Sequence, residues 1–304
     1  MKIILFLFFL TLSFYANENL FKALPLNEPV YTQKVKLGQK LFHDTLLSKD
    51  NTISCATCHP VLNYGVDNLR KSIGIKGQKG DRNTPTVWNA VYNFSQFWDG
   101  RAKDLKEQAL DPIINPKEMG ETLASVVEKL KKDEYYVREF DEIYEDGISA
   151  NNLADAIAEY EKTLTTPKSK FDSYLRGDIS ALSAKEKEGL KLFIDKGCIA
   201  CHNGQNIGGN LYQKSGVYEE IQIEGSPDLG RYNITKKVFD KYYFKVPSLR
   251  NVEMTAPYFH DGSAVTLKDA VAIMVKSQLG RQLKDEEIDD IVLFLKTLTG
   301  HVHE

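Results

Sequence analysis

Two copies of one five-residue motif constrain this chain of 304 residues more than any other feature. The copies are Cys55-Ala56-Thr57-Cys58-His59 and Cys198-Ile199-Ala200-Cys201-His202. Two cysteines two residues apart, followed directly by histidine, form the attachment signature of a c-type haem, in which the histidine ligates the iron. All four cysteines of the chain fall in these copies, so none remains for a disulfide or a separate zinc site. The sequence therefore predicts two covalently bound haem c groups.

The start of the chain predicts export. Met1-Lys2, an apolar run over residues 3–14 and Ala16 read as a signal peptide over residues 1–16. Phe14 stands where cleavage sites prefer a small residue, so an uncleaved anchor remains the alternative. Because c-type haem is attached outside the bacterial inner membrane, we expect the protein in the periplasm. The net charge of −3, with both signs interspersed, indicates no nucleic-acid partner.

Self-similarity extends beyond the two motifs and indicates a duplicated unit. The paired segments are residues 37–42 and 189–193, 84–89 and 246–251, 97–100 and 259–262, and the closing amphipathic helices 152–164 and 285–298. A helix, a haem motif, irregular loops and a closing helix follow in the order of the class I cytochrome c fold, which each unit resembles. We therefore expect a mostly α fold with two cytochrome c domains, 17–166 and 167–304, divided at Pro167.

Local signals give further expectations about the second unit. Ser183 and Glu186 predict a capping box that starts a helix. Strand signals are sparse, and a short hairpin arm is expected over residues 217–223. His301 and His303 fall in a tail that we expect to fray and, like His43, are not expected to ligate iron.

Several longer stretches resemble the bacterial di-haem cytochrome c peroxidases, in that family's order. They are Asn83-Thr84-Pro85-Thr86, residues 96–102, residues 105–109, Asn115-Pro116-Lys117-Glu118-Met119, residues 255–262, and Met274 with Gln278-Leu279-Gly280. The resemblance covers essentially the whole chain after the signal peptide. It implies an enzyme that reduces hydrogen peroxide to water with electrons from a small reduced c-type cytochrome, and a homodimer.

The resemblance implies that the N-terminal haem, on His59, is the peroxidatic centre. Glu118 would be the general acid/base that moves a proton between the peroxide oxygens, and Gln108 would orient peroxide and water through its amide. A carboxyl group beside a haem pocket suits this role because desolvation raises its pKa toward the working pH. Judged by residue type alone, Glu118 would instead be a solvated loop charge.

The C-terminal haem, on His202, would be the electron-entry centre with Met274 as its sixth ligand. Thioether ligation favours ferrous iron and so a high reduction potential. Met274 also falls at helical spacing with neighbouring valines, so ordinary core packing is the other interpretation. Met254 is the alternative ligand and ranks lower, since it lies beside the Thr255-Ala256-Pro257 turn.

Five further residues gain roles from the resemblance. Trp98 would lie between the haems and carry electronic coupling, and is otherwise a buried aromatic. His260, its counterpart in the repeat, would hydrogen-bond a haem propionate. Asn83, with the backbone carbonyls of Thr255 and Pro257, resembles the family's interdomain calcium site, and oxygen-only ligands suit Ca²⁺.

Two other functions are compatible with two haem motifs. The first is a di-haem electron carrier whose irons are both saturated and which has no turnover. The second is a di-haem oxidase that modifies a protein substrate. Those oxidases are expected to carry tyrosine where this chain has Met274, which counts against the second alternative.

The chain departs from the family pattern after the first haem motif. Many members carry a Ser-Ile-Gly-His run whose histidine caps the peroxidatic iron until the other haem is reduced. Here the run is Ser72-Ile73-Gly74-Ile75, and the Ile75 side chain has no lone pair for iron. Gly74, Gly77 and Gly80 are expected to keep the segment flexible. We therefore expect a five-coordinate or water-ligated N-terminal haem in the oxidised protein, and no need for reductive activation.

Overall fold

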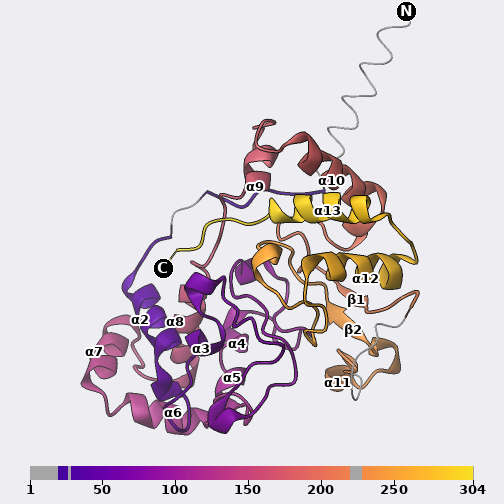
Figure 1. The fold of residues 1–304 in the computed structure, drawn as a ribbon. Helices are drawn as coiled ribbons and strands as arrows, with labels where there is room; N and C mark the ends of the chain where they lie inside the picture. Colours follow the sequence, from indigo (N-terminus) through magenta and orange to yellow (C-terminus); the bar gives the residue numbers. More distant parts are fainter. Residues whose placement is uncertain (1–19, 27–28, 220–227, 304) are drawn as a thin grey trace, which may run out of the picture.

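The computed structural model describes residues 20–26, 29–219 and 228–303 (Figure 1). The predicted signal peptide over residues 1–16 lies outside these ranges. The fold is mostly α, as the sequence predicts, and its two units lie side by side. Among the described residues, no helix has both the length and the apolar character needed to cross a membrane.

The first unit is a group of helices around the first haem motif. Its opening helix begins after Thr32, whose side chain accepts a hydrogen bond from the Val35 N–H and satisfies one free donor of the first turn. Its helices are α2 (Gln33–His43), α3 (Cys55–Cys58), α4 (Leu105–Gln108), α5 (Asp111–Ile114), α6 (Leu123–Leu130), α7 (Glu134–Ile143) and α8 (Ala150–Glu161). The predicted closing helix is therefore α8.

The second unit repeats this plan and adds a two-stranded ribbon. Its helices are α9 (Lys170–Leu175), α10 (Ala184–Asp195), α11 (Tyr232–Thr235), α12 (Leu267–Leu279) and α13 (Asp285–Lys296). The predicted capping box of Ser183 and Glu186 is confirmed at the start of α10. Antiparallel strands β1 (Tyr212–Lys214) and β2 (Tyr243–Lys245) pair Tyr212 with Lys245.

The predicted hairpin arm over residues 217–223 is wrong in the part that the structure describes. Residues 217–219 form bends, and residues 220–223 lie outside the described ranges. The Tyr218 and Glu219 N–H groups both donate to the Ser277 carbonyl on α12. Because these donors are used by a helix end, they are not available to a strand partner.

Both units depend on a close crossing between the helix that precedes the haem motif and the last helix of the unit. A Cβ placed on Gly38 of α2 would lie 1.9 Å from the carbonyl oxygen of Ala156 on α8. A Cβ placed on Gly189 of α10 would lie 1.9 Å from the carbonyl oxygen of Asp290 on α13. Only glycine permits this approach of two backbones. The crossings stand at equivalent positions of the predicted repeat.

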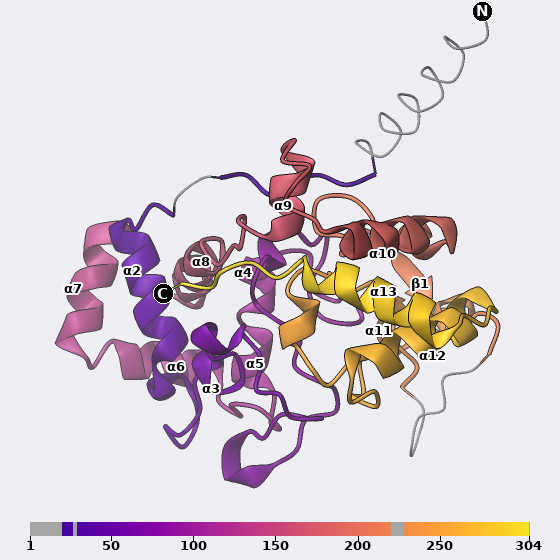
Figure 2. The ribbon, with the colours of Figure 1, turned by 45° about the horizontal axis from the view of Figure 1, so that its top comes forward.

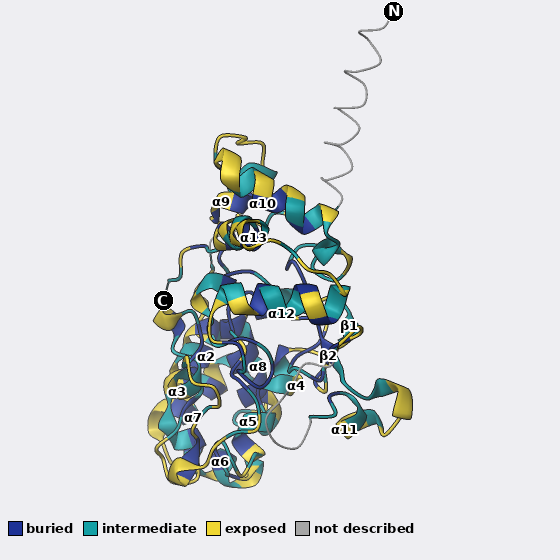
Figure 3. Cartoon of the chain, turned by 45° about the vertical axis from the view of Figure 1, so that its right-hand side comes forward, coloured by how far each residue is buried: buried dark blue, intermediate teal, exposed yellow. Residues whose placement is uncertain are grey.

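Each unit has its own apolar core, and the two cores are distinct. The first gathers Leu41, Phe42, Trp88, Phe140, Leu153 and Tyr160, and the second gathers Phe171, Phe193, Ile207, Ile291, Phe294 and Leu298. In Figure 3 buried residues concentrate between the helices, and exposed residues line the outer turns of α6 and α10. Two separate cores are what two haem-binding domains require.

Matching backbone geometry confirms the duplication. Asn89 and Asn251 are both fully buried and left-handed, with φ of 62° and 61°. Their N–H groups donate to the carbonyls of Leu164 and Leu298, which follow the two closing helices. The Thr166 hydroxyl lies between the two asparagines, 2.9 Å from Asn89 Nδ2 and 3.1 Å from Asn251 Nδ2. The units therefore meet at a shared threonine, while their division at residue 167 stays a prediction.

The first described residues belong to the core of the second unit. Phe21 packs edge-on against Phe171, with ring centroids 5.3 Å apart. The Leu24 N–H donates to Asp172, which is also paired with Arg250 at 2.9 Å. Both side chains of this ion pair are fully buried, and bidentate geometry stabilises such a pair. The segment that precedes α2 therefore packs against the second unit.

The C-terminal tail makes the reciprocal crossing (Figure 2). Val302 packs against the first core, and the Tyr64 hydroxyl donates to the Gly300 carbonyl at 3.3 Å. The rings of His303 and Trp88 are 5.2 Å apart. The expectation of a fraying tail is therefore wrong for residues 300–303, because the Val302 side chain, the hydrogen bond from Tyr64 and the contact of His303 with Trp88 hold them against the first unit.

We predict that Gly38→Ala and Gly189→Ala each lower the free energy of unfolding by about 1–3 kcal/mol, because the added methyl group overpacks the helix crossing. Helix propensity alone would make alanine the more stable residue. Thermal unfolding of the haem-loaded protein measures the change. Gly80→Ala is the matched control, since the nearest atom would lie 3.6 Å away. Equal stability of all three variants would contradict the prediction.

Candidate active site

The first haem motif places its histidine for iron ligation. The His59 Nδ1 lies 3.0 Å from the Gly65 carbonyl oxygen, which can only accept, so Nδ1 carries the proton. The Nε2 lone pair is thereby left free for a metal. Burial lowers the pKa of His59, which favours the neutral imidazole. The free thiols of Cys55 and Cys58 flank it on α3, so these residues fit a covalently bound haem.

Glu118 lies beside this motif, in the turn after α5. Burial raises the pKa of Glu118, while Arg101 and a hydrogen bond from Asn115 lower it. The Asn115 Nδ2 donates to Glu118 Oε1 at 2.7 Å and fixes the direction of the carboxyl group. Burial raises the pKa of the Cys55 and Cys58 thiols, and the charge of Glu118 adds to this effect. Glu118 therefore lies near the first haem motif, and its acid/base role stays a prediction.

Gln108 stands nearby at the end of α4. It is half-buried, and its backbone N–H donates to the Asp104 carbonyl. Within the described part of the chain, no hydrogen bond joins its amide to Glu118. Its orienting role stays a prediction.

The loop that departs from the family pattern packs directly on the Glu118 turn. The Ile75 N–H donates to the Glu118 carbonyl at 2.9 Å, and the Ile75 side chain is only 4% exposed. A Cβ on Gly74 would lie 2.1 Å from the Lys117 carbonyl oxygen, so glycine is needed there for close packing. This packing role of Gly74 was not foreseen. The loop and the acid/base candidate thus form one packed structure.

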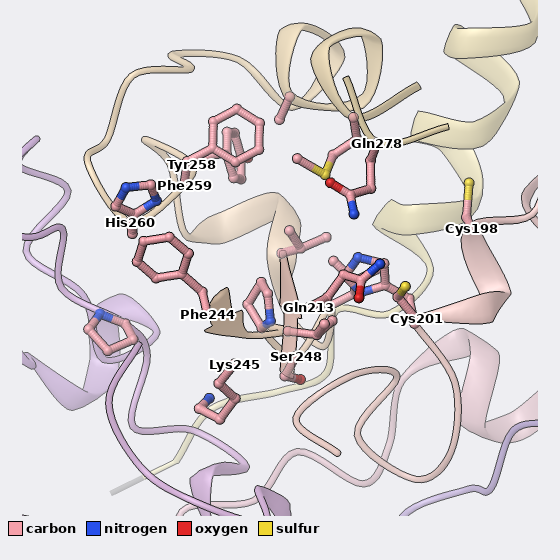
Figure 4. A pocket seen from close by; sticks show the side chains of 18 of the residues that line it. Cys198, Cys201, Gln213, Phe244, Lys245, Ser248, Tyr258, Phe259, His260 and Gln278 are labelled. Carbon is pink, nitrogen blue, oxygen red and sulfur yellow. The ribbon is translucent and has the colours of Figure 1, made fainter. Parts of the chain in front are cut away.

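The second haem motif faces a cavity of about 280 Å³ (Figure 4). Cys198, Cys201 and His202 line it together with Met274 on α12, so the predicted axial pair meets in one space. Burial lowers the pKa of His202 to about 4, which keeps the imidazole neutral. Met254 is 38% exposed and is not among the residues that line the cavity. The placement therefore favours Met274 over Met254.

Trp98 and His260 meet where the units touch. The backbone N–H of Asn83 donates to the His260 carbonyl at 2.8 Å, and that of Lys245 donates to the Trp98 carbonyl at 2.7 Å. When the two repeats are aligned, Asn83 corresponds to Lys245 and Trp98 to His260. Each unit therefore donates the same backbone hydrogen bond to the other unit. The Trp98 Nε1 also donates to the Asn83 carbonyl at 2.9 Å.

The His260 ring stacks on Phe244 with centroids 4.1 Å apart, and both line the cavity. Its Nε2 is buried and has no hydrogen-bond partner among the described residues. A buried polar atom without a partner is costly unless a bound group supplies one. The atom therefore fits the predicted hydrogen bond to a haem propionate.

The predicted calcium ligands lie in two segments that the structure brings together. The Asn68 Nδ2 donates to the Ala256 carbonyl at 2.8 Å, between Thr255 and Pro257. The backbone bond from Asn83 to His260 holds the same two segments together. In the described ranges, no group of three or more His, Cys, Asp or Glu side chains is arranged to hold a metal. A cation here would therefore depend on amide and carbonyl oxygens.

Sequence reasoning missed two buried ionisable side chains. Glu161 is 4% exposed at the end of α8, and its charge raises the pKa of the Cys55 thiol after the larger effect of burial. Its spacing from Ala154 and Ile157 could have placed it on the inner face of the helix. Lys245 lines the second cavity, and the repeat register could have shown that it replaces Asn83.

Comparison with known proteins decides the family. The family described as "Di-haem cytochrome c peroxidase" matches residues 32–180, and "Cytochrome c" matches residues 186–299. Cytochrome c551 peroxidase of Pseudomonas aeruginosa (strain PAO1) is 48% identical over 92% of this chain and 84% of its own length. The chain belongs to the di-haem cytochrome c peroxidase family. This confirms two predictions from the sequence: that the chain belongs to this family, and that it is a peroxidase with two haem c groups.

Two other family relatives show the breadth of the match. Cytochrome c peroxidase Ccp of Escherichia coli (strain K12) is 47% identical over 91% of this chain, which spans 60% of that relative's length. A crystal structure of a MauG-like protein associated with microbial copper homeostasis has a TM-score of 0.78, at 28% identity over 92% of this chain and 93% of that one. The fold is therefore shared along nearly the whole length.

We predict that Glu161→Gln changes how stability depends on pH. Burial raises the pKa of Glu161 to about 8, so the folded protein keeps a proton that the unfolded chain releases near pH 4.5. Wild-type stability should therefore fall as pH rises between these values, by roughly 1.4 kcal/mol per pH unit.

Thermal unfolding of the haem-loaded proteins from pH 5 to 8 measures this effect. The stability of the variant relative to wild type should increase with pH and level off above pH 8. A difference that stays constant over the range would show that Glu161 is not buried as a neutral acid.

Proposed function

We propose that this protein is a periplasmic peroxidase that reduces hydrogen peroxide to water with electrons from a small reduced c-type cytochrome. The observation that carries the proposal is the position of Glu118, a half-buried carboxyl group with a raised pKa beside the first haem motif. A group of this kind can both accept and return a proton near neutral pH. Membership of the di-haem peroxidase family supports the reaction.

The first part of the mechanism belongs to the side chains around His59. When bound, the haem held by His59 would supply the iron site for peroxide, and the haem held by His202 would supply electrons one at a time. Glu118 takes the proton from the nearer peroxide oxygen and returns it to the departing oxygen. Asn115 holds Oε1 of Glu118 at 2.7 Å, so the carboxyl group is oriented before peroxide arrives. Gln108 orients peroxide and the product water.

The second part concerns electron delivery between the units. Trp98 lines the cavity of the second haem motif while its indole N–H and backbone carbonyl are fixed by Asn83 and Lys245. An aromatic ring held on both sides at the contact of two domains can provide coupling without rearrangement. His202 and Met274 would ligate the iron of the electron-entry haem.

The remaining partners follow from the same proposal. Export by the predicted signal peptide would bring the chain to the compartment where haem c is attached. Ca²⁺ at Asn83, Thr255 and Pro257 would fasten the contact between the units through oxygen ligands. We propose a homodimer on family membership alone, and sedimentation of the haem-loaded protein would test it.

We predict that Glu118→Gln keeps both haems and their reduction behaviour but lowers peroxidase turnover roughly 10²–10⁴-fold, because the amide cannot move a proton. Steady-state turnover with hydrogen peroxide and a reduced c-type cytochrome measures the loss. Glu107→Gln, at an exposed carboxyl group on α4, is the matched control and should keep full turnover. Turnover of Glu118→Gln within a few-fold of wild type would refute the assignment.

We predict that the fully oxidised wild-type protein binds peroxide and cyanide rapidly at the N-terminal haem, since Ile75 cannot ligate iron. Ile75→His should give a low-spin, bis-histidine ferric haem whose ligand binding is slow until the C-terminal haem is reduced. Magnetic resonance and stopped-flow binding measure both. Ile73→His, at a 45% exposed position of the same loop, is the control. A wholly low-spin wild-type haem would contradict the prediction.

The same measurements separate the alternatives. A di-haem electron carrier would show no high-spin ferric haem and no rapid cyanide binding in wild type. A protein-modifying oxidase would need no cytochrome donor for turnover with peroxide. The presence of Met274 in the second cavity favours electron entry through that haem.

A further inference from the structure

Lys245 is a buried cation without a counter-charge among the residues that the structure describes. It ends β2, is only 8% exposed, and lines the cavity of the second haem motif. Figure 4 shows its side chain at the cavity wall, beneath Phe244. Its backbone N–H is occupied by the Trp98 carbonyl, which fixes the residue at the contact between the units.

No carboxylate of the described residues forms an ion pair or hydrogen bond with the Lys245 ammonium group. A buried ammonium group is costly unless an anion or several acceptors lie close to it. Burial alone lowers the pKa of Lys245 to about 8, with no neighbouring charge to oppose it. The cavity wall is otherwise mostly apolar, with Phe244, Val246, Leu249 and Val271 among its residues. The missing anion must therefore come from what fills the cavity.

The cavity's predicted occupant carries such an anion at one edge. Haem c is bonded to the protein through the vinyl edge of the porphyrin, and its two propionate carboxylates lie on the opposite edge. In Figure 4, Cys198 and Cys201 stand on one side of the cavity, whereas Lys245 and His260 stand across from them. A haem attached to these cysteines therefore directs its carboxylates toward Lys245 and His260.

We infer that Lys245 binds a propionate carboxylate of the haem attached to Cys198 and Cys201, and that it raises the reduction potential of that haem. Reduction adds one negative charge to the haem, so a cation beside the propionate stabilises the reduced state. The inference depends on haem attachment at the second motif and not on peroxidase activity.

The repeat makes the inference specific to one haem. The alignment of residues 84–89 with residues 246–251 makes the neutral Asn83 the equivalent of Lys245 in the first unit. Both residues donate their backbone N–H to the neighbouring unit, so their backbones occupy equivalent places. The first unit therefore has no lysine where the second has one. At this position the two units therefore differ by one charge.

The test compares Lys245→Met, Lys245→Arg and Lys214→Met in the haem-loaded protein. Lys214 lines the same cavity from the paired strand β1 but is exposed, so water screens its charge. Spectroelectrochemical titration gives the midpoint potential of each haem, and resonance Raman spectra report hydrogen bonding of the propionates.

Lys245→Met should lower the midpoint potential of the C-terminal haem by at least a tenfold change in the reduction equilibrium, about 59 mV, and shift its propionate bands. Lys245→Arg and Lys214→Met should remain near wild type. If Lys245→Met does not mature, Lys245→Gln replaces it with the same expected shift. An unchanged potential, or a shift at the N-terminal haem alone, would overturn the inference whatever the peroxidase turnover.

Discussion

The close contact of two helix backbones is the constraint on which both units depend. At Gly38 and at Gly189 the helix that precedes the haem motif touches a carbonyl oxygen of the last helix of the unit. The haem motif follows that helix after a short connection, so this crossing sets where the cysteines stand relative to the closing helix. Irregular loops can then vary around a fixed frame. This explains how the first unit can hold the carboxyl group of Glu118 near its haem motif while the second holds the thioether of Met274.

The contact between the units is formed by equivalent segments of the two repeats, each of which bonds to the other unit. Asn83 reaches His260, and Lys245 reaches Trp98, through equivalent backbone hydrogen bonds. The backbone is thus nearly symmetric, whereas the side chains are not: an indole stands opposite an imidazole, and an amide opposite an ammonium group. A pseudo-symmetric scaffold with unequal side chains gives two haems different chemistry at little structural cost. The proposed electron transfer from the haem on His202 to the haem on His59 requires such a difference.

Much of this arrangement could be predicted from the sequence because its signals are local. The spacing within each Cys-Cys-His motif, the register of residues 84–89 against 246–251, and the helical periodicity of the closing segments each involve few residues. They give the fold class, the duplication and the haem-binding residues. Glu118 and Met274 came from the family resemblance, and the structure brings both to the predicted motifs.

The rest depended on contacts between distant segments. Nothing local shows that Gly74 must admit the Lys117 carbonyl, or that the tail at Val302 belongs to the other unit. Lys245 looks like an ordinary strand lysine until its burial is known, because a sequence does not reveal which lysines lack a counter-charge. The hairpin over residues 217–223 was misplaced since the partner of residues 217–219 is a helix end.

The segments near the two ends of the chain each pack against the core of the other unit. Phe21 completes the second core, and Val302 packs against the first. If the chain were divided between the two units, the N-terminal fragment would keep Phe21 of the second core and lose Val302. The C-terminal fragment would keep Val302 and lose Phe21. Separation of the two halves would expose apolar surface on both, so we expect each half alone to be less stable than the whole protein.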